Sequence, residues 1–269
     1  MFYNAKNKSV KIGNTSISYA EFGTGEKYMV MLPGMGDGLR ADKKLAHMYA
    51  FLYGKFAKDY KVYVFSQKTE MPDRYSTRKM AADMNEAMGI LGIEKADVIG
   101  VSLGGMIAQH LAADYPERVE KLVLVVSAAR RNQYTQATIS GWIEMAKRGD
   151  YRKLMVDNLK KMYTRKYLEK NSWMIKVAGK FGKPKSYERY IIMGKACIHH
   201  DAYEKLEKIQ AETLVVGGEL DRTLGAKGSY ELAERIPNST LKMYPQYGHA
   251  LYEEAKDFIE TVLDFLHNE

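Results

Sequence analysis

Short apolar runs that alternate with helical patterns are the feature that most constrains the fold of this chain. Strands that are apolar throughout and separated by helices predict a largely parallel, twisted sheet with helices on both faces, an α/β class. The runs are YMVMLPG, KVYVFS, ADVIGVS, LVLVVSA, TLVVGGE and the weaker STLKMYP. Apolar residues at helical spacing predict helices over 77–91, 105–114 and 254–266. The opening SVKIGNTSISYAEFG alternates around Gly-Asn and predicts a β-hairpin.

The alternation stops between residues 130 and 206, where no convincing strand pattern is found. Segments such as YRKLMVDNLKKMYTRKYLEK instead place apolar residues on one helical face. The sequence therefore predicts a core made of 1–129 and 207–269, with 130–206 inserted as a helical cap, or lid.

Composition and charge limit the function classes. Residues 142–189 hold fourteen Lys or Arg against five Asp or Glu, within a chain of net charge +8. The chain shows no zinc-finger spacing, RNA-binding motif or Walker loop, so we expect no nucleic-acid partner. The longest apolar run, LVLVV, is too short for a membrane span, and MFYNAKNKS lacks a signal-peptide core. The single cysteine, Cys197, excludes an intramolecular disulfide and suits a cytoplasmic location. We expect Cys197 to be a core residue, while a homo-oligomer remains an open possibility.

Residues 100–104, GVSLG, fit the G-x-S-x-G pattern of a nucleophile elbow, with a predicted strand before them and a helix after them. A sharp strand-to-helix turn lifts the central hydroxyl above the sheet, and small neighbours let the chain pass close by. The N-terminus of the following helix supplies free N–H groups near that hydroxyl. The pattern predicts Ser102 as a nucleophile.

A serine hydroxyl needs a base to act at neutral pH, and the base needs a carboxylate to orient it. His249 lies in YPQYGHALYEE, between the last predicted strand and the terminal helix. TLVVGGELDRT places Asp221 and Glu219 just past a strand end. We expect Asp221 to be the acid because it lies further into the loop, with Glu219 as the alternative. The order Ser, acid, His is the one that this kind of sheet requires.

An oxyanion hole needs a second donor from another loop. LPGMGDG, residues 32–38, follows a predicted strand, and we assign the two donors to the backbone N–H groups of Met35 and Leu103. Dinucleotide binding by this loop is disfavoured, because Pro33 stands where G-x-G-x-x-G needs its first glycine.

These segments together resemble the α/β-hydrolase-fold serine hydrolases along nearly the whole chain. The resemblance is carried by LPGMG, GIEKADVIGVSLGGMIAQHLAADYPERVEKLVLVVSA, GGELDRT and YGHALYEE, and is strongest to the carboxylesterase, enol-lactonase and C–C hydrolase branch. It implies a catalytic triad of Ser102, Asp221 and His249, and a helical lid over 130–206. Two departures stand out: Leu32-Pro33-Gly34 replaces the common His-Gly, and FSQKTEMPDRYS lacks the family's glycine turn.

We therefore expect a serine hydrolase that cleaves a small carboxylic ester, lactone or thioester through an acyl-enzyme, with no metal and no organic cofactor. A C–C bond hydrolase, a cofactor-free perhydrolase or haloperoxidase, and a low-turnover ligand receptor are the alternatives. An apolar pocket in such an enzyme would be lined largely from the lid. The candidate substrate-binding residues are Gly34, Trp142, Met145, Met162 and Trp173, with Tyr163 and Met174 as further lid candidates.

Overall fold

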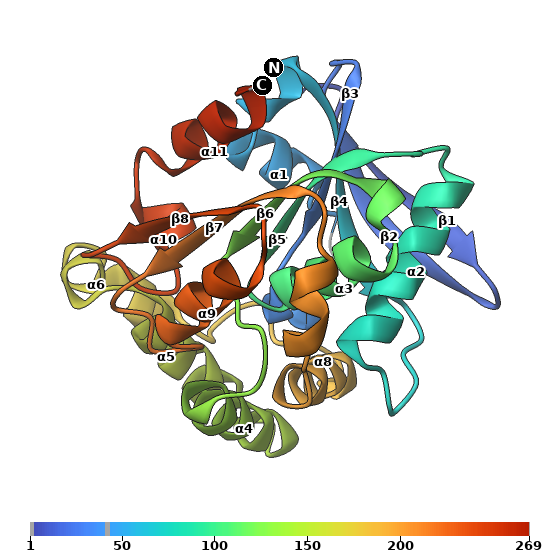
Figure 1. Ribbon diagram of the computed structural model, residues 1–269. Helices are drawn as coiled ribbons and strands as arrows, with labels where there is room; N and C mark the ends of the chain where they lie inside the picture. The colour runs from blue at the N-terminus through green and yellow to red at the C-terminus, as the bar shows by residue number, and fades with distance from the viewer. Residues whose placement is uncertain (1–2, 41–43, 269) are drawn as a thin grey trace.

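The computed structural model describes residues 3–40 and 44–268, and these form one eight-stranded sheet of order β1-β2-β4-β3-β5-β6-β7-β8 (Figure 1). The predicted hairpin pairs β1 with β2, and β2 with β4 is also antiparallel, whereas every later pairing is parallel. The mostly parallel sheet expected from the apolar runs is thus confirmed. The strands are β1 Lys6–Ile12, β2 Thr15–Phe22, β3 Lys27–Leu32, β4 Tyr60–Lys68, β5 Ala96–Val101, β6 Val119–Val125, β7 Glu212–Gly218 and β8 Ser239–Tyr244.

Helices cover both faces of the sheet, and alternate strand residues supply two cores. In β3, Val30 and Leu32 join the core under α2, α3 and α9, whereas Met29 and Met31 join the core under α1, α10 and α11. The period of two in a strand sends neighbouring side chains to opposite faces, so a strand buried on both faces is apolar throughout. The helices outside the β6–β7 segment are α1 Ala46–Leu52, α2 Thr77–Ile90, α3 Leu103–Asp114, α9 Lys227–Arg235, α10 Leu251–Glu254 and α11 Phe258–His267.

Every named element between β6 and β7 is helical, and Figure 1 shows α4, α5 and α8 grouped away from α1 and α11. The base of this segment is marked by an isolated antiparallel bridge between Arg130 and Asp201. Close packing holds α4 against α8, since a Cβ added to Gly194 would lie 2.9 Å from the Ile143 side chain. The elements are α4 Gln133–Lys147, α5 Tyr151–Met162, α6 Arg165–Lys170, α7 Trp173–Val177, α8 Glu188–Ile198 and the 3-10 helix η4 Tyr203–Lys208.

The terminal helix differs from its prediction over 254–266. The helix α11 begins only at Phe258, because Ala255 adopts an extended conformation (φ −82°, ψ 115°) that ends the preceding short helix, α10, at Glu254. Two amphipathic pieces separated by a short turn preserve apolar spacing, so the sequence pattern alone did not show the break. Both pieces bury their apolar residues against the same core as α1.

Candidate active site

The strand-to-helix turn at Ser102 is sharp and strained. Strand β5 ends at Val101 and α3 begins at Leu103, while Ser102 itself has φ 55° and ψ −115°. Such a conformation is costly for a residue with a side chain and is found mainly at functional sites. A Cβ at Gly104 would lie 1.8 Å from the Leu32 carbonyl oxygen, and one at Gly100 would lie 2.6 Å from that of Gly104. The turn therefore needs glycine at both positions.

Three side chains from distant parts of the chain meet above the strand ends. The Nε2 atom of His249 lies 3.0 Å from Ser102 Oγ, and its Nδ1 atom lies 2.8 Å from Asp221 Oδ2. Asp221 follows β7 and His249 follows β8, so two neighbouring parallel strands bring these two side chains to one edge of the sheet. A carboxylate only accepts, so Nδ1 of His249 carries a proton and Nε2 is free to accept one from Ser102.

The carboxyl of Asp221 is buried yet well satisfied. Its Oδ1 atom accepts hydrogen bonds from the backbone N–H groups of Thr223 at 2.7 Å and Leu224 at 3.1 Å. Burial acts to raise the pKa of Asp221, but the charge of His249 and these hydrogen bonds together hold it below its usual value. The carboxyl of the alternative, Glu219, instead accepts a hydrogen bond from the Tyr230 hydroxyl on an exposed part of the surface.

The glycine-rich loop after β3 lies beside the serine. It forms a 3-10 helix, η1 Met35–Leu39, and a Cβ at Gly34 would lie only 3.4 Å from Ser102 Cβ. Leu103 is the first residue of α3, where a backbone N–H has no acceptor within its own helix. Met35 and Leu103, the two expected donors, therefore lie on the two chain segments that flank the serine.

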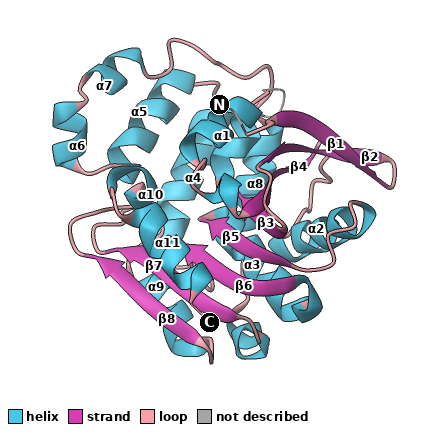
Figure 2. Cartoon of the chain, turned by 90° about the horizontal axis from the view of Figure 1, so that it is seen from above, coloured by secondary structure: helices cyan, strands magenta, loops and turns pink. Residues whose placement is uncertain are grey.

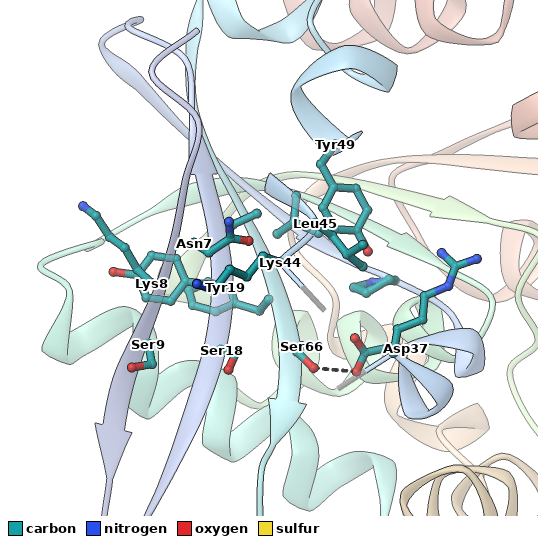
Figure 3. A pocket seen from close by; sticks show the side chains of 15 residues that line it. Asn7, Lys8, Ser9, Ser18, Tyr19, Asp37, Lys44, Leu45, Tyr49 and Ser66 are labelled. Atoms are coloured by element: carbon teal, nitrogen blue, oxygen red, sulfur yellow. Dashed lines mark hydrogen bonds between the residues drawn. The ribbon is translucent and has the colours of Figure 1, made fainter. Parts of the chain in front are cut away.

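The side chain of Asp37 bonds η1 to β4 and to α8. Its carboxylate accepts hydrogen bonds from the Ser66 hydroxyl at 2.6 Å, drawn in Figure 3, and from the Gln67 backbone N–H at 3.3 Å. Arg189 of α8 approaches the same carboxylate at 3.5 Å. Burial raises the pKa of Asp37, although Ser66 and Arg189 oppose that rise. The loop after β3 is thus held to β4 and to a helix of the β6–β7 segment through one carboxylate, that of Asp37.

The end of α5 is joined to the loops that carry Asp221 and His249. The Met162 carbonyl accepts a hydrogen bond from the Ala250 N–H at 2.9 Å, next to His249. Glu254 accepts from the Thr164 backbone N–H at 2.9 Å, and Arg222, next to Asp221, donates to the Lys160 carbonyl. We call residues 160–164, with these contacts, the α5 clasp.

A buried polar series runs from the elbow through the core. Ser127 donates to the Ser102 carbonyl at 2.9 Å, and Gln109 donates to the Ser127 hydroxyl at 3.3 Å. His200 lies 3.3 Å from Gln109 through Nε2 and 2.9 Å from the Thr77 hydroxyl through Nδ1. Sequence analysis missed this series, because its members are separated by up to 123 residues and follow no motif.

The candidate substrate-binding residues of the predicted lid have different environments. Trp142 is buried, and its indole N–H donates to Asp157 of α5 at 2.8 Å. Met145 and Met162 are partly buried against the core, whereas Trp173 on α7 is 60% exposed. Trp142 therefore joins α4 to α5, and Trp173 faces solvent. Of the two further lid candidates, Tyr163 is buried and donates to Glu253, and Met174 is half-buried.

A cavity of about 450 Å³ lies beside the loop after β3 (Figure 3). Pro33, Asp37 and Tyr49 line it together with residues of β1, β2 and β4, but Ser102, Asp221 and His249 do not.

Within the described ranges, no group of three or more His, Cys, Asp or Glu is placed to hold a metal ion. None of the helices described in the structure combines the length and apolar character of a bilayer span. Cys197 is buried in the core, and burial raises the pKa of its thiol to about 12.

Comparison with known proteins agrees with this architecture. A family model described as "alpha/beta hydrolase fold" matches residues 30–256. A 2-hydroxy-6-oxononadienedioate/2-hydroxy-6-oxononatrienedioate hydrolase of Pseudomonas putida is 28% identical over 264 residues, covering 93% of this chain and 91% of the relative. A putative carbamate hydrolase, RutD, of a Caulobacter strain is 27% identical over 205 residues, 74% of this chain and 75% of the relative.

Solved structures show the same fold. The enol-lactonase of Burkholderia xenovorans superposes with a TM-score of 0.84 at 21% identity, covering 97% of this chain and all of that one. MGS-M2, an α/β hydrolase from a deep-sea metagenome library, superposes with a TM-score of 0.87 at 22% identity, covering 97% and 98% of the two chains. The strand order, the elbow and the family match agree, and the chain belongs to the α/β-hydrolase fold family and is a hydrolase.

Proposed function

We propose that this chain is a serine hydrolase that cleaves a small carboxylic ester, lactone or thioester through an acyl-enzyme. The observation that carries the proposal is the continuous hydrogen-bonded series Ser102–His249–Asp221, with donor–acceptor distances of 3.0 and 2.8 Å, built on a strained elbow. Nucleophile, base and orienting acid within hydrogen-bond reach are the arrangement that activates a serine hydroxyl.

In the first step His249 Nε2 takes the Ser102 proton while Oγ bonds to the substrate carbonyl carbon. Asp221 holds the imidazole in the tautomer that accepts at Nε2, and its charge stabilises the imidazolium that forms. The tetrahedral carbon then expels the alkoxide or thiolate, which takes the proton from His249. The acyl group remains on Ser102 as an ester.

The negative charge of the tetrahedral state is assigned to the backbone N–H groups of Met35 and Leu103. Removal of one such donor typically costs about 3–4 kcal/mol of transition-state stabilisation. The hydrogen bonds of Asp37 support this assignment, because they fix η1, which begins at Met35, before substrate binds. In the second step His249 deprotonates water as the water oxygen attacks the acyl carbon. The departing Ser102 Oγ takes that proton from His249, and the carboxylic acid product is released.

The substrate is expected between the elbow and the helical segment 130–206, which we propose as the cap. Gly34 lies against Ser102, so a substrate there meets no side chain from that position. Met145 and Met162 remain candidate pocket residues, and Trp142 is assigned to the support of α4 against α5. Trp173 is left out of the pocket, because 60% of it is exposed on α7.

C–C bond hydrolysis is the second candidate. It is favoured by the Pseudomonas putida relative, which is aligned over 93% of this chain and is named for a 2-hydroxy-6-oxo dienedioate substrate. In such a substrate Ser102 Oγ would give its proton to His249 and bond to a ketone carbon. The C–C bond next to that carbon then breaks, and the departing carbon takes the proton from His249, leaving an acyl-enzyme. The same triad serves both reactions, so the substrate decides between them.

A substrate panel separates the candidates. Short p-nitrophenyl esters, γ-lactones, an aryl carbamate and a 2-hydroxy-6-oxo-dienoate are offered to the purified chain and to Ser102→Ala. We expect ester or lactone turnover that the Ser102→Ala variant lacks. Turnover confined to the dienoate would replace the first candidate by the second. Tight binding of a panel compound with no turnover would contradict both and point to a receptor.

A further inference from the structure

The α6–α8 part of the chain exposes apolar side chains that no other described element covers. Trp173 is 60% exposed, Val177 38% and Phe181 80%, all within nine residues. Neither α6 nor α7 has a buried residue. Figure 2 shows both helices on the outer side of α5, away from the sheet. The apolar groups therefore face solvent at the periphery of the molecule.

The backbone that follows these side chains packs closely against α5. Trp173 and Val177 are four residues apart on α7 and share one helical face. Gly179, with φ +70°, turns the chain directly against α5, since a Cβ there would lie 2.4 Å from the Arg152 Cα. Ala178 is buried beside it. The exposed rings of Trp173 and Phe181 therefore flank a stretch, residues 178–179, that is packed against the rest of the protein.

Positive charge surrounds the same side chains. Residues 165–187 hold seven Lys or Arg and a single acid, Glu169, which pairs with Arg165. The six lysines of this stretch are all exposed, and none makes an ion pair with any residue that the structure describes: Lys166, Lys170, Lys176, Lys180, Lys183 and Lys185. We call residues 165–187 the basic–aromatic surface.

We propose that the basic–aromatic surface binds an anionic lipid surface, with Trp173, Val177 and Phe181 entering the headgroup region and the lysines contacting lipid phosphates and carboxylates. Tryptophan concentrates at membrane interfaces, and lysine extends its charged end to the headgroups while its stem stays in apolar surroundings. Clustered lysines add electrostatic attraction to acidic lipids. This inference does not depend on the proposed reaction.

The charge and the apolar residues disfavour two other occupants. A second copy of this chain would bring six unpaired lysines against six more, which is repulsive. Single-stranded nucleic acid would offer phosphates to the lysines and bases that stack on the aromatic rings. It would leave the aliphatic Val177, beside Trp173, without an apolar partner. An acidic bilayer surface accommodates all three kinds of side chain.

Vesicle co-sedimentation tests the proposal with the full chain. Phosphatidylcholine vesicles with and without phosphatidylserine are the probes, and we expect binding only when phosphatidylserine is present, weakened by added salt. The Trp173→Ser/Phe181→Ser variant is expected to lose at least tenfold in affinity. Phe51→Ser is the matched control, because Phe51 on α1 is also 80% exposed but lies outside the surface.

Fluorescence gives a second reading. Trp173 emission is expected to shift to shorter wavelength on addition of phosphatidylserine vesicles, and Trp173→Phe removes that shift. Absence of vesicle binding, equal loss of affinity in Phe51→Ser, or binding of a single-stranded oligonucleotide in place of vesicles would overturn the proposal. So would a dimer that Trp173→Ser/Phe181→Ser dissociates. Circular dichroism and the melting temperature establish that each variant is folded.

Discussion

Acid is expected to destabilise this protein through two buried histidines, His110 and His200. They are 3% and 2% exposed, and their rings meet edge to face at 5.3 Å. Burial lowers the pKa of His110 to about 4 and that of His200 to about 3, from 6.5. Because the folded pKa is lowered, the unfolded chain binds more protons below pH 6.5. The stabilisation is present above pH 6.5 and is lost as the pH falls toward 4 and 3.

The magnitude follows from these values. At pH 5.5 each histidine of the unfolded chain is about 90% protonated, whereas its folded counterpart stays neutral, which costs about 1 kcal/mol relative to pH 7 for each group. The pair together lowers the free energy of unfolding by about 2–3 kcal/mol over this interval. Such a loss is a sizeable part of the stability of an ordinary domain, roughly 5–15 kcal/mol.

Urea unfolding at pH 7 and pH 5.5 measures the effect. Comparison with His110→Phe isolates one histidine, since all carboxyl groups titrate in both proteins. We expect the pH-dependent loss to be smaller by about 1 kcal/mol in His110→Phe. The exposed His199, replaced by Phe, is the control and should keep the parent's dependence. Equal pH dependence in His110→Phe and the parent would refute the reasoning.

Further predictions concern the elbow, the triad, the clasp and the charge. Gly104→Ala places a Cβ 1.8 Å from the Leu32 carbonyl and should lower stability by about 1–3 kcal/mol or more, so an unchanged melting temperature would contradict the steric argument. Asp221→Asn should lower kcat by about 10⁴ with little change in KM, whereas a loss below tenfold would remove Asp221 from the triad. Glu254→Gln weakens the α5 clasp and should lower kcat with the fold intact. Glu260→Gln, at an exposed ion pair, is its control, and equal kcat in the two variants would argue against the clasp. Added salt should slow turnover of anionic esters more than neutral ones, because the cap is basic, and parallel salt profiles would count against steering.

The sheet and the elbow were predictable because their signals are local. Strands buried on both faces must be apolar throughout, and the parallel order follows from the helices between them. Ser102 was predicted as the nucleophile because the sharp turn requires glycine on both sides of it, and this requirement is visible in the local sequence. His249 and Asp221 followed from their places after two strands, since parallel strands deliver their carboxyl ends to one edge.

Other features had no local signal. The contact of His200 with Gln109 joins residues 91 apart, and each alone reads as an ordinary polar residue. Trp173 and Val177 have the spacing of a core-facing helix, yet α7 has no buried residue, because apolar spacing defines a face without saying what covers it. The expectation that Trp173 lines the pocket required knowing which element covers that helical face, and apolar spacing does not show this.

The identity of the nucleophile is tested most directly by covalent labelling with a fluorophosphonate probe. Intact mass and peptide mapping should show one adduct on Ser102, absent from Ser102→Ala and suppressed in a variant of His249. Labelling that persists in Ser102→Ala, or an adduct mapped to another residue, would contradict the account.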